Sequence, residues 1–510
     1  MLVKTFGCAL FGIEAIQVTI EVNIERGINF YLVGLPDNAV KESQQRIQAA
    51  IGNLGYHYPH NKIVINMAPA DIRKEGSAYD LPIAIGIMAA SEQVSTDLLE
   101  QFVIMGELSL DGTLKPIKGA LPIAIKAKQD GFRGLIVPKS NAREAAVVES
   151  LDVYGVENIH DVVSILNGEL LNQPVTVDMA ESWQDVSFEF DFSDVKGQEN
   201  IKRALEIAAA GGHNVILIGP PGSGKTMLAK RMPTILPPLT MAEALETTKI
   251  HSVAGLIGRN ASLVRTRPFR SPHHTISDAG LVGGGTYPQP GEISLAHNGV
   301  LFLDELPEFK RTVLEVMRQP MEDRYVTISR AKMTVDFPAN FMLVAAMNPC
   351  PCGYYNHPDK ECTCKPGMVQ QYLNRISGPL MDRIDLHVEV VPVAYNDLSS
   401  KSGGESSAAV RERVIKARKI QEKRYAEYPN IHANAQMTSQ LIQKYCELDE
   451  ECRTILKNAM NRFGLSARAY DRILKVSRTI ADLDASENIK PEHLAEALNY
   501  RSVDRDNWGN

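Results

Sequence analysis

The segment that most constrains this chain of 510 residues is Gly219-Pro-Pro-Gly-Ser-Gly-Lys-Thr226, which fits the pattern G-x-x-x-x-G-K-[ST]. It follows an apolar run expected to form a strand, Val215–Ile218, and precedes an expected helix at Met227–Arg231. Glycines let backbone N–H groups surround phosphates without a clash with Cβ, and the helix N-terminus adds its dipole. The pattern predicts that Lys225 contacts the β- and γ-phosphates of a nucleoside triphosphate and that the Thr226 hydroxyl binds Mg²⁺.

Two other strand ends carry polar groups that such a site requires. The apolar run Val300–Leu303 ends in Asp304 and Glu305. In P-loop proteins an acid at this place holds Mg²⁺, and an adjacent glutamate is placed to polarise the attacking water, which favours hydrolysis over nucleotide sensing. The run Phe341–Ala346 leads to Asn348, whose amide can reach the γ-phosphate or the water; an Asn-Pro turn is the alternative. The residues expected to bind ATP and Mg²⁺ are Gly219, Pro220, Pro221, Gly222, Ser223, Gly224, Lys225, Thr226, Met227 and Asp304.

Hydrophobic patterning divides the chain into three blocks. Residues 192–393 alternate continuous apolar strands with helices, as in a parallel sheet covered on both faces. Residues 1–166 are a mixed α/β domain, and residues 408–510 have helical spacing typical of a small bundle. An acidic linker at 167–191 and a Ser/Gly-rich hinge at 394–407 separate the blocks.

Particular elements follow from the same patterning. In the first block we expect strands at Ile16–Ile24, Asn29–Val33 and Ile63–Met67, and helices at Ala39–Ile51 and Tyr79–Ala90. In the last block the helical segments are Ala408–Tyr425, Ser439–Phe463 and Tyr470–Asp482.

Composition excludes several classes of protein. An apolar content of 44% excludes a disordered chain, and no window of about 18 uncharged apolar residues suggests a membrane span. The N-terminal segment lacks the features of a signal peptide, and seven cysteines make no disulfide framework, so we expect a cytoplasmic protein with no membrane partner. The net charge of −7 argues against nucleic-acid binding over the whole surface but allows a local basic channel.

Four of the cysteines lie close together in the sequence. Cys350, Cys352, Cys362 and Cys364 fall within 15 residues, directly after Asn348. Four thiolates complete a tetrahedral zinc site that would fix the conformation of this loop. Free reduced thiols are the alternative interpretation.

Further motifs are found at Pro268–His274, Gly283–Gly285, Ser377–Asp385, Ser466–Arg468 and Leu474–Asp482. Together they resemble those of the AAA+ ATPases, in the magnesium-chelatase-like branch and specifically in the ComM/YifB family. The resemblance extends over essentially the whole chain. It implies an α/β fold with an AAA+ P-loop core and an α-helical C-terminal lid.

The resemblance also assigns roles to polar residues and implies a homo-hexamer. Asn348 looks like sensor 1, Arg468 like sensor 2 in the lid, and Arg383 like an arginine finger that reaches the ATP of the neighbouring subunit. A cation at that position stabilises charge that develops on the transferred phosphoryl group. The alternative for Arg383 is a surface ion pair with Asp382.

Two segments are candidates for a central pore. Thr226 and Asp304 are much further apart than the dozen or so residues of a simple crossover, which predicts an insertion within Arg259–Glu292 that resembles the helix-2 insert. This insertion contains the adjacent residues His273 and His274. We assign them to loop structure or pore contact and not to a metal site, because adjacent histidines rarely both reach one ion. A hairpin expected at Tyr325–Val335 carries Arg330 and Lys332 at its tip, where cations would bind phosphates without sequence preference; a solvated tip is the alternative.

The first 166 residues resemble the proteolytic domain of Lon, a ribosomal S5 domain 2-like fold also found in the recombination ATPase RadA. The matching stretches are Lys74–Pro82, Gly106–Gly112 and Ile136–Pro138 with the following Asn141–Ala145. From the position of these stretches, the catalytic serine of Lon falls at Ala78 and the lysine at Leu121. Ser77 and Lys118 lie nearby but out of register; the alternative is a shifted register in which they form the pair. We therefore expect a non-proteolytic scaffold for ring assembly or DNA contact.

The resemblance implies an ATP-driven hexameric DNA motor, a helicase or branch-migration factor. It would promote integration of single-stranded DNA in natural transformation and homologous recombination, with single-stranded and branched DNA and recombination proteins such as a recombinase as partners. The alternatives are a metal-chelatase motor subunit, against which residues 1–166 count, an ATP-dependent protease, and an ATP-switched assembly scaffold. The basic helix Ala408–Tyr425 is either a DNA contact or, in the preferred interpretation, a solvated face of the lid.

Overall fold

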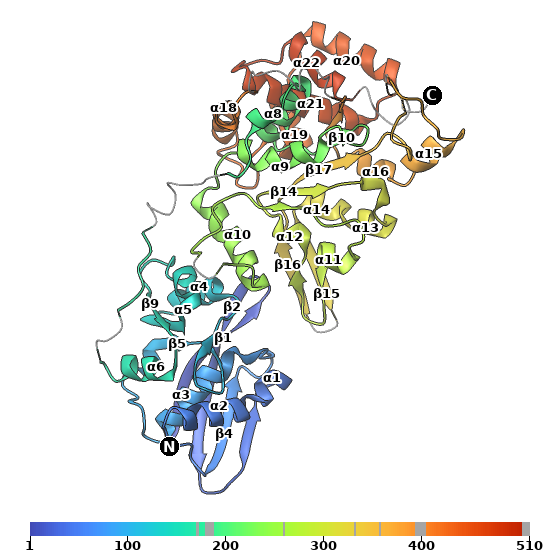
Figure 1. Cartoon of the computed structure of the whole chain (residues 1–510). Coiled ribbons are helices and arrows are strands. Elements are labelled where there is room, and N and C mark those ends of the chain that lie inside the picture. Colours follow the sequence, from blue (N-terminus) through green and yellow to red (C-terminus); the bar gives the residue numbers. More distant parts are fainter. Residues whose placement is uncertain are drawn as a thin grey trace. The chain divides into compact units, whose positions relative to one another are not determined.

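The computed structural model of the chain (Figure 1) describes residues 1–169, 173–178, 188–258, 261–330, 333–355, 357, 359–392 and 404–501. It separates into two compact units. Unit 1 consists of Met1–Val186, Thr240–Arg265 and Ser329–Phe337, and unit 2 of Ser187–Leu239, Thr266–Ile328 and Pro338–Asn510. Parts of the expected linker (170–172 and 179–187) and hinge (394–403), residue 393 of the expected core, Lys332 and the C-terminal residues 502–510 lie outside the described residues.

Unit 1 is organised around a seven-stranded mixed sheet with the order β3-β4-β2-β1-β5-β8-β9. Its two longest strands pair antiparallel, and side chains at alternate positions of the second, Val18, Ile20 and Val22, are fully buried. This period of two confirms the strand predicted at Ile16–Ile24. The strands are β1 (Leu2–Phe11), β2 (Glu14–Glu25), β3 (Phe30–Val33), β4 (Lys62–Ala68), β5 (Phe102–Ile104), β8 (Gly134–Pro138) and β9 (Asp152–Val156).

The central helix of unit 1 is α3 (Asp80–Ala90), every residue of which is buried. It packs on β1 and β2, and a Cβ at Gly86 would lie 2.7 Å from a methyl carbon of Val22, so only glycine allows this close approach. The other helices of this unit are α1 (Asn38–Lys41), α2 (Ser43–Asn53), α4 (Ala120–Gln129), α5 (Lys139–Ala145), α6 (Ile159–Leu166) and α10 (Met241–Ala254).

Unit 2 contains a five-stranded sheet in which every pair of neighbours is parallel. The order is β11-β14-β17-β10-β18, so the strand that carries the phosphate-binding loop lies between β17 and β18. The inner strands are buried on both faces, which confirms the prediction of a covered parallel sheet. The strands are β10 (Val215–Ile218), β11 (Phe269–Arg270), β14 (Val300–Leu303), β17 (Met342–Met347) and β18 (Leu386–Glu389).

The helices of unit 2 fall into a group around the sheet and a C-terminal group, the lid. Those around the sheet are α8 (Glu199–Gly211), α9 (Lys225–Ile235), α11 (Asp278–Val282), α12 (Glu292–Leu295), α13 (Arg311–Val316), α14 (Arg318–Asp323), α15 (Met368–Leu373) and α16 (Gly378–Met381). Those of the lid are α18 (Ser407–Arg424), α19 (Ser439–Tyr445), α20 (Glu450–Phe463), α21 (Ala467–Leu483) and α22 (Pro491–Asn499). As predicted, the described part of the lid contains no strand.

A buried polar network joins the lid to the sheet within unit 2. Asp385 precedes β18, is 1% exposed, and accepts hydrogen bonds from Arg472 of α21 at 2.8 Å and from the His213 ring at 3.2 Å. Burial opposes ionisation of Asp385, yet the positive charge of Arg472 and the hydrogen bond from His213 hold its pKa below the usual range. These bonds fix α21 against the end of the sheet.

Two predicted helices are divided in the structure. The segment Ala39–Ile51 breaks at Glu42 into α1 and α2. The segment Ser439–Phe463 breaks before Asp449, whose carboxylate caps α20 by accepting the backbone N–H of Cys452 at 2.8 Å. Glu42 makes no side-chain cap hydrogen bond to α2, so only the second break has a capping side chain, and the apolar spacing shows neither break.

The two candidate pore segments contain regular structure. The expected insertion includes β11, a strand of the main sheet, followed by α11 and the short pair β12 (Gly283–Gly284) and β13 (Gln289–Pro290). The expected hairpin is confirmed as β15 (Tyr325–Arg330) and β16 (Met333–Pro338). The segment of α10, which lies between α9 and β11 in the sequence, belongs to unit 1.

Candidate nucleotide-binding site

The carboxyl ends of three neighbouring strands bring the predicted nucleotide-binding residues together. Lys225 begins α9 after β10, Asn348 follows β17, and Asp304 follows β14. The Lys225 ammonium donates to Asn348 Oδ1 at 3.2 Å, and Thr226 Oγ1 donates to Asp304 Oδ2 at 2.6 Å. The structure therefore places these four residues in one site.

The loop between β10 and α9 has the backbone that phosphate binding requires. Gly222 and Gly224 have φ values of 79° and 88°, in the left-handed region that side chains disfavour. A Cβ at Gly222 would meet no atom within 4 Å, so the cradle is open there. The Ser223 hydroxyl is buried and has no hydrogen-bond partner among the described residues. A bound phosphate could accept hydrogen bonds from the exposed backbone N–H groups of this loop and from the Ser223 hydroxyl.

Lys225 is 8% exposed, and its charge is held by neutral oxygen atoms. Its ammonium donates to the carbonyl oxygens of Gly219 at 2.7 Å and Pro220 at 2.9 Å. Burial lowers the pKa of Lys225, and the negative charges of Asp304 and Glu305 oppose this shift. A phosphate group would supply the anionic partner that the ammonium does not have in the loop.

The residues present fit a bound ATP and Mg²⁺. The Thr226 hydroxyl and the Asp304 carboxylate are hard oxygen donors on adjacent elements, which is the chemistry that Mg²⁺ prefers. The carboxylate is half-buried, and the Met227 side chain, also expected near the nucleotide, is 38% exposed. The remaining predicted contacts are backbone groups of the loop.

Glu305 has an unusual backbone and a partner that sequence reasoning did not assign to it. Its φ and ψ are 52° and 48°, a left-handed conformation in a residue with a side chain, and the side chain is 57% exposed. One carboxylate oxygen lies 3.5 Å from His274 Nδ1. The ring of His274 in turn lies 4.1 Å from that of His273. The two histidines thus lie in a loop, with His274 beside Glu305.

Arg383 lies two residues after α16 and is held by contacts within the same chain. Its guanidinium pairs with Glu322 at 2.5 Å and donates to the carbonyl oxygen of Pro379 at 2.6 Å. It is 7% exposed, and its Nε has no hydrogen-bond partner among the described residues. The observed ion pair is with Glu322, and not with the adjacent Asp382. Arg468, in contrast, is exposed in the first turn of α21.

Three residues that sequence reasoning missed support the nucleotide loop. The Gln198 amide donates to the carbonyl oxygens of Ser223 at 3.0 Å and Val391 at 3.1 Å. The hydroxyl of Tyr372 in α15 lies beside the backbone of Asn348. A Cβ at Gly353 would lie 2.6 Å from Cδ of Pro221. None of these contacts has a sequence signature, because each joins residues that are remote in the chain.

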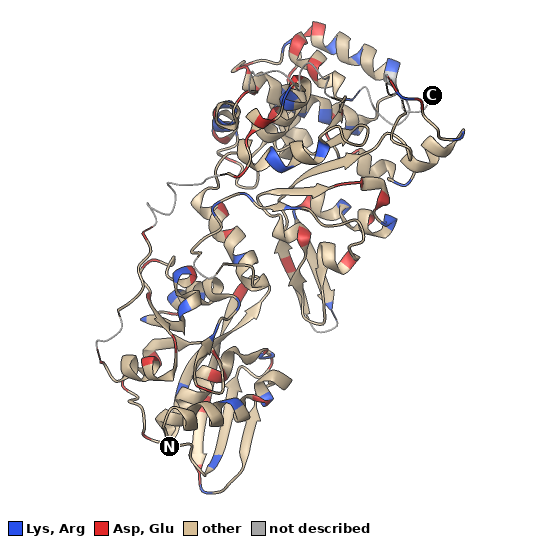
Figure 2. Cartoon of the chain, viewed as in Figure 1, with Lys and Arg blue, Asp and Glu red and all other residues tan. Residues whose placement is uncertain are grey.

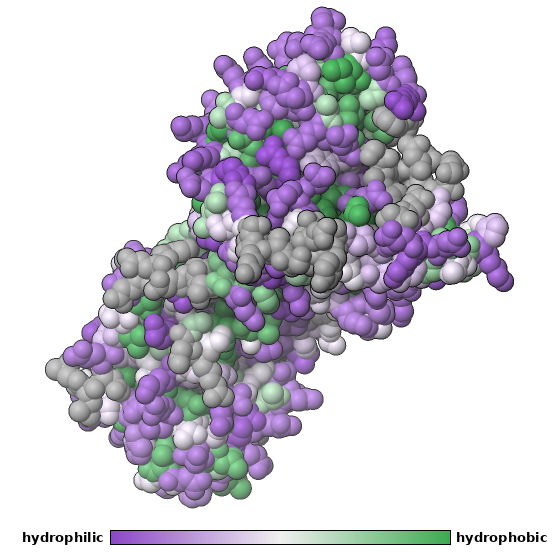
Figure 3. Space-filling model, turned by 45° about the horizontal axis from the view of Figure 1, so that its top comes forward, coloured by the Kyte–Doolittle hydropathy of each residue, from purple (hydrophilic) through white to green (hydrophobic). Residues whose placement is uncertain are grey.

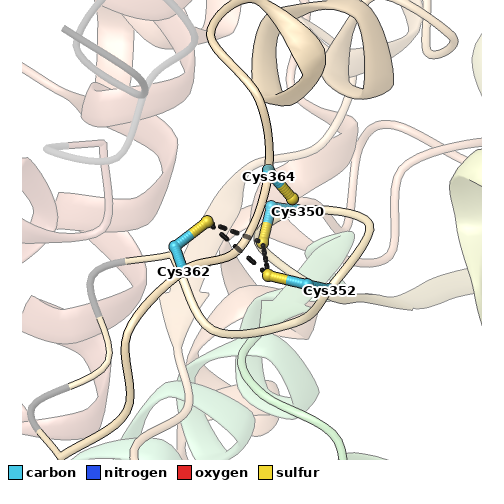
Figure 4. Close-up of side chains that lie close together, drawn as sticks. All are labelled: Cys350, Cys352, Cys362 and Cys364. Carbon is cyan, nitrogen blue, oxygen red and sulfur yellow. Dashed lines mark hydrogen bonds between the residues drawn. The ribbon is translucent and has the colours of Figure 1, made fainter.

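The four clustered cysteines converge in the structure (Figure 4). Their sulfur atoms all lie within 4.8 Å of one another, and Cys350 Sγ is 3.3 Å from Cys352 Sγ and 3.8 Å from Cys362 Sγ. Four sulfurs at about 2.3 Å from one zinc ion would be roughly 3.8 Å apart. This geometry therefore fits a tetrahedral metal site.

The loop also favours a thiolate in this cluster. The pKa of Cys352 is lowered to about 5. Burial raises this pKa, but backbone N–H groups of Tyr354 and Thr363 and hydrogen bonding to Cys350 lower it by more. Burial raises the pKa of Cys350 to about 12. The other cysteines, Cys8, Cys446 and Cys452, are buried and unpaired.

Acidic and basic residues are interspersed in both units (Figure 2). Arg330 is exposed at the end of β15, and its expected companion Lys332 lies outside the described residues. The basic residues of α18 are largely engaged within unit 2: Arg413 pairs with Glu206 at 2.5 Å, Arg424 pairs with Asp482 at 2.5 Å, and Arg418 donates to the carbonyl oxygen of Ala209. These contacts favour the interpretation of α18 as a face of the lid.

In unit 1 the positions aligned with a Ser–Lys protease pair carry no such chemistry. Leu121 is fully buried and packs in a small apolar cluster with Val147 and Leu263. The Ser77 hydroxyl donates to the carboxylate of Glu107. The aliphatic chain of Lys118 lies against Gly255. Ser77 and Lys118 therefore have separate partners.

No helix in the described part of the chain is long and apolar enough to cross a membrane. Most of the face drawn in Figure 3 is hydrophilic, with apolar residues in scattered groups.

Comparison with known proteins identifies the family. The model of "Magnesium chelatase, subunit ChlI" matches residues 191–398, "Subunit ChlI of Mg-chelatase" matches residues 20–141, and "Magnesium chelatase, subunit ChlI C-terminal" matches residues 404–501. "Competence protein ComM" of Haemophilus influenzae is 48% identical over 503 residues, which cover 98% of this chain and 97% of that protein. The YifB protein of Escherichia coli is 46% identical over 98% of this chain and 96% of its own length. The chain belongs to the ComM/YifB family of magnesium-chelatase-like AAA+ proteins.

Membership in this AAA+ family implies binding of ATP and Mg²⁺. The sheet order and the polar strand ends of unit 2 agree with that fold. "Lon protease 2" of Bacillus subtilis is 33% identical over 152 residues, which cover 28% of this chain and 26% of that protein. The Lon-like part of the fold prediction is thereby supported.

Proposed function

We propose that this ComM/YifB family member is an ATP-dependent hexameric DNA motor, a helicase or branch-migration factor that extends integration of single-stranded DNA during natural transformation and homologous recombination. The observation that carries the proposal is the convergence of Lys225, Thr226, Asp304 and Asn348 in a chain similar over its whole length to a protein named for competence. Single-stranded and branched DNA would be its substrates, and a recombinase or other recombination proteins its partners.

ATP hydrolysis would use residues at the strand ends of unit 2. Lys225 and the backbone N–H groups of the loop would hold the phosphates, and Thr226 and Asp304 would hold the Mg²⁺ that neutralises phosphate charge. Asn348 would orient the γ-phosphate or the attacking water. Glu305, exposed and adjacent to Asp304, would accept a proton from that water.

Completion of the site would require a neighbouring copy of the chain. Arg383 would leave Glu322 and reach the ATP of the next subunit, and Arg468 of the lid would respond to the bound nucleotide. A finger supplied in trans requires each subunit to contact the next around a closed ring. The proposed assembly is therefore a homo-hexamer.

DNA would be held by phosphate contacts. The hairpin β15–β16 presents Arg330, and the insertion presents the segment around Gly283–Gly285. Arginine and lysine on such loops neutralise phosphates, so binding would be insensitive to base sequence and weakened by salt. The arginines of α18 are not assigned to DNA, since most are engaged within unit 2.

Zn²⁺ is the proposed ligand of the four-cysteine cluster, where it would be structural. Unit 1 is proposed to be a non-proteolytic scaffold, supported by the buried Leu121 and by the separate partners of Ser77 and Lys118. Seven unpaired cysteines support a cytoplasmic location.

The proposal is tested by strand exchange on three- and four-stranded DNA with ATP. The wild-type chain should move a DNA junction only when ATP is hydrolysed. The Lys225→Ala variant should not move the junction under any of these conditions. If ATP turnover is indifferent to DNA and no junction moves, the chain is instead an ATP-switched scaffold.

A chelatase-type motor subunit is the second candidate, favoured by the names of the three matching family models. The full-length similarity to a competence protein favours the DNA motor. The same assay separates them, since a chelatase subunit would leave the junction in place.

A further inference from the structure

The four-cysteine loop touches the nucleotide-binding loop. Cys350 to Gly353 form a turn in which the Gly353 N–H donates to the Cys350 carbonyl oxygen at 3.0 Å. Gly353 has φ 85°, and its Cα packs so tightly on Pro221 that a Cβ would lie 2.6 Å from Pro221 Cδ. Pro221 is itself a residue of the phosphate-binding loop. One end of the cysteine cluster is thus in van der Waals contact with the loop that would hold the phosphates.

A second connection runs through Asn348. It lies two residues before Cys350, and its amide oxygen accepts the Lys225 ammonium at 3.2 Å. On the other side of the cluster, the chain passes from Cys364 into α15, whose Tyr372 hydroxyl lies beside the backbone of Asn348. The cysteine loop therefore begins and ends at contacts to the same polar residue of the nucleotide site.

The loop has little regular structure of its own. Between the end of β17 at Met347 and the start of α15 at Met368, the described residues form no helix or strand. Loops of this length without secondary structure are uncommon in compact domains, and a bound metal ion can hold such a loop in one conformation. Where a metal is bound by residues that the unfolded chain does not preorganise, its binding free energy becomes folding free energy of the segment.

We infer that a metal ion bound by Cys350, Cys352, Cys362 and Cys364 holds the Gly353–Pro221 contact and Asn348 in place, so that metal occupancy controls nucleotide binding by the adjacent loop. The inference deepens the proposed nucleotide site and zinc ligand, on which it rests. It is independent of any DNA activity. Zinc suits the site because four thiolates are soft donors and Zn²⁺ requires no redox partner.

Metal content and nucleotide affinity of the full chain are the two measurements. Purified protein should contain about one zinc per chain by elemental analysis, as a four-thiolate site predicts. A fluorescent ATP analogue should bind it in the absence of DNA. Removal of zinc by a chelator should weaken that binding by about tenfold or more, and readdition of zinc should restore it, because the phosphate-binding loop and Asn348 would lose part of their preorganised geometry.

Two glycine variants distinguish the effect of the Gly353–Pro221 contact from the effect of metal binding. Gly353→Ala places a methyl group against the rigid Pro221 ring and should keep zinc but weaken nucleotide binding. Gly367→Ala is the matched control, because Gly367 has a similar φ of 79° in the same loop but nothing lies within 4 Å of its Cβ position. This control should change neither quantity. Cys364→Ser should lose zinc and nucleotide affinity together, whereas Cys8→Ala, in unit 1, should keep both.

Three results would overturn the inference. They are a protein that binds no zinc even when refolded with it, a zinc-free protein with unchanged nucleotide affinity, and equal behaviour of the two glycine variants. Circular dichroism of each variant distinguishes a local effect from unfolding, and a chain that unfolds as a whole without zinc would contradict local control. If nucleotide binding follows zinc but no DNA junction moves, the motor proposal fails and this inference stands.

Discussion

Both units are built on a sheet with buried apolar strands, but they differ in the polar residues at the positions where catalytic groups would lie. In unit 2 the strand ends carry Lys225, Asp304 and Asn348, and the buried Ser223 hydroxyl has no partner among the described residues. In unit 1 the position aligned with the lysine of Lon carries the buried Leu121. Unit 2 thus has binding capacity left for a ligand.

Polar groups near Leu121 satisfy one another. The buried Glu144 carboxylate accepts the Leu121 N–H at 3.0 Å and the hydroxyl of Ser252 from α10. Lys249 of the same helix pairs with Glu14 at 2.9 Å. The comparison shows that buried titratable groups do not by themselves indicate a ligand-binding site. Buried polar atoms without a hydrogen-bond partner, next to an accessible backbone, indicate one more strongly.

Lys225 carries the largest expected effect on ATP binding. Lys225→Ala should weaken ATP binding by about 100-fold or more, because a charge-assisted phosphate contact is lost from a buried position. Titration of a fluorescent ATP analogue measures it. Lys230→Ala, an exposed lysine on the same helix, is the control and should bind normally. Equal binding by both variants would remove the basis for assigning chemistry to unit 2.

Glu305→Gln should separate binding from turnover. The variant keeps the size of the side chain but cannot accept a proton, so kcat should fall by roughly 10² to 10⁴ while ATP affinity is retained. Glu308→Gln is the control, because Glu308 is a nearby acid that pairs with Arg375 at 2.8 Å. Steady-state phosphate release measures kcat, and an unchanged rate for Glu305→Gln refutes its role as general base.

Arg383→Ala tests whether the site of unit 2 is completed by a second subunit. Removal of a cation that stabilises the transferred phosphoryl group should lower ATPase activity by about 10³. Mixing this variant with Lys225→Ala should recover part of the activity, since an intact nucleotide loop of one subunit then faces an intact Arg383 of the next. Absence of recovery in mixed assemblies would indicate action within one subunit.

Glu144 offers the smallest effect and tests unit 1. Burial raises the pKa of Glu144 above 4.5, although hydrogen bonds from Ser252 and Leu121 oppose the shift. Between 4.5 and the raised value the folded state binds more protons than the unfolded state, so stability contributed by this group is present below pH 4.5 and falls as pH rises through that window. Glu144→Gln, which cannot ionise, should be at least as stable as the wild type at pH 7.

Urea unfolding of the full chain from pH 5 to pH 7.5 measures this difference. The exposed Glu149→Gln is the control and should show no pH-dependent difference from the wild type. ATPase activity should be equal in all three proteins. A large loss of stability or of activity in Glu144→Gln would show that its charge is needed, and unit 1 would then resemble unit 2.

Much of unit 2 was predictable from local sequence. The phosphate-binding loop, the strands ending in Asp304 and Asn348, and the helical lid each follow from spacing within a few tens of residues. The four cysteines were also grouped correctly, since they lie within 15 residues of one another. These features depend on backbone requirements and hydrophobic period, which are local properties of the chain.

Tertiary structure alone decided which partners the functional side chains have. Several contacts join segments that are distant in the sequence: Arg383 pairs with Glu322, Gly353 contacts Pro221, and Leu121 packs with Leu263. In the same way, α10 lies in unit 1 although its neighbours in the sequence, α9 and β11, lie in unit 2. The identity of a strand or a loop is set by its own residues, whereas the surroundings of a side chain depend on which other segments the packing of the core brings against it.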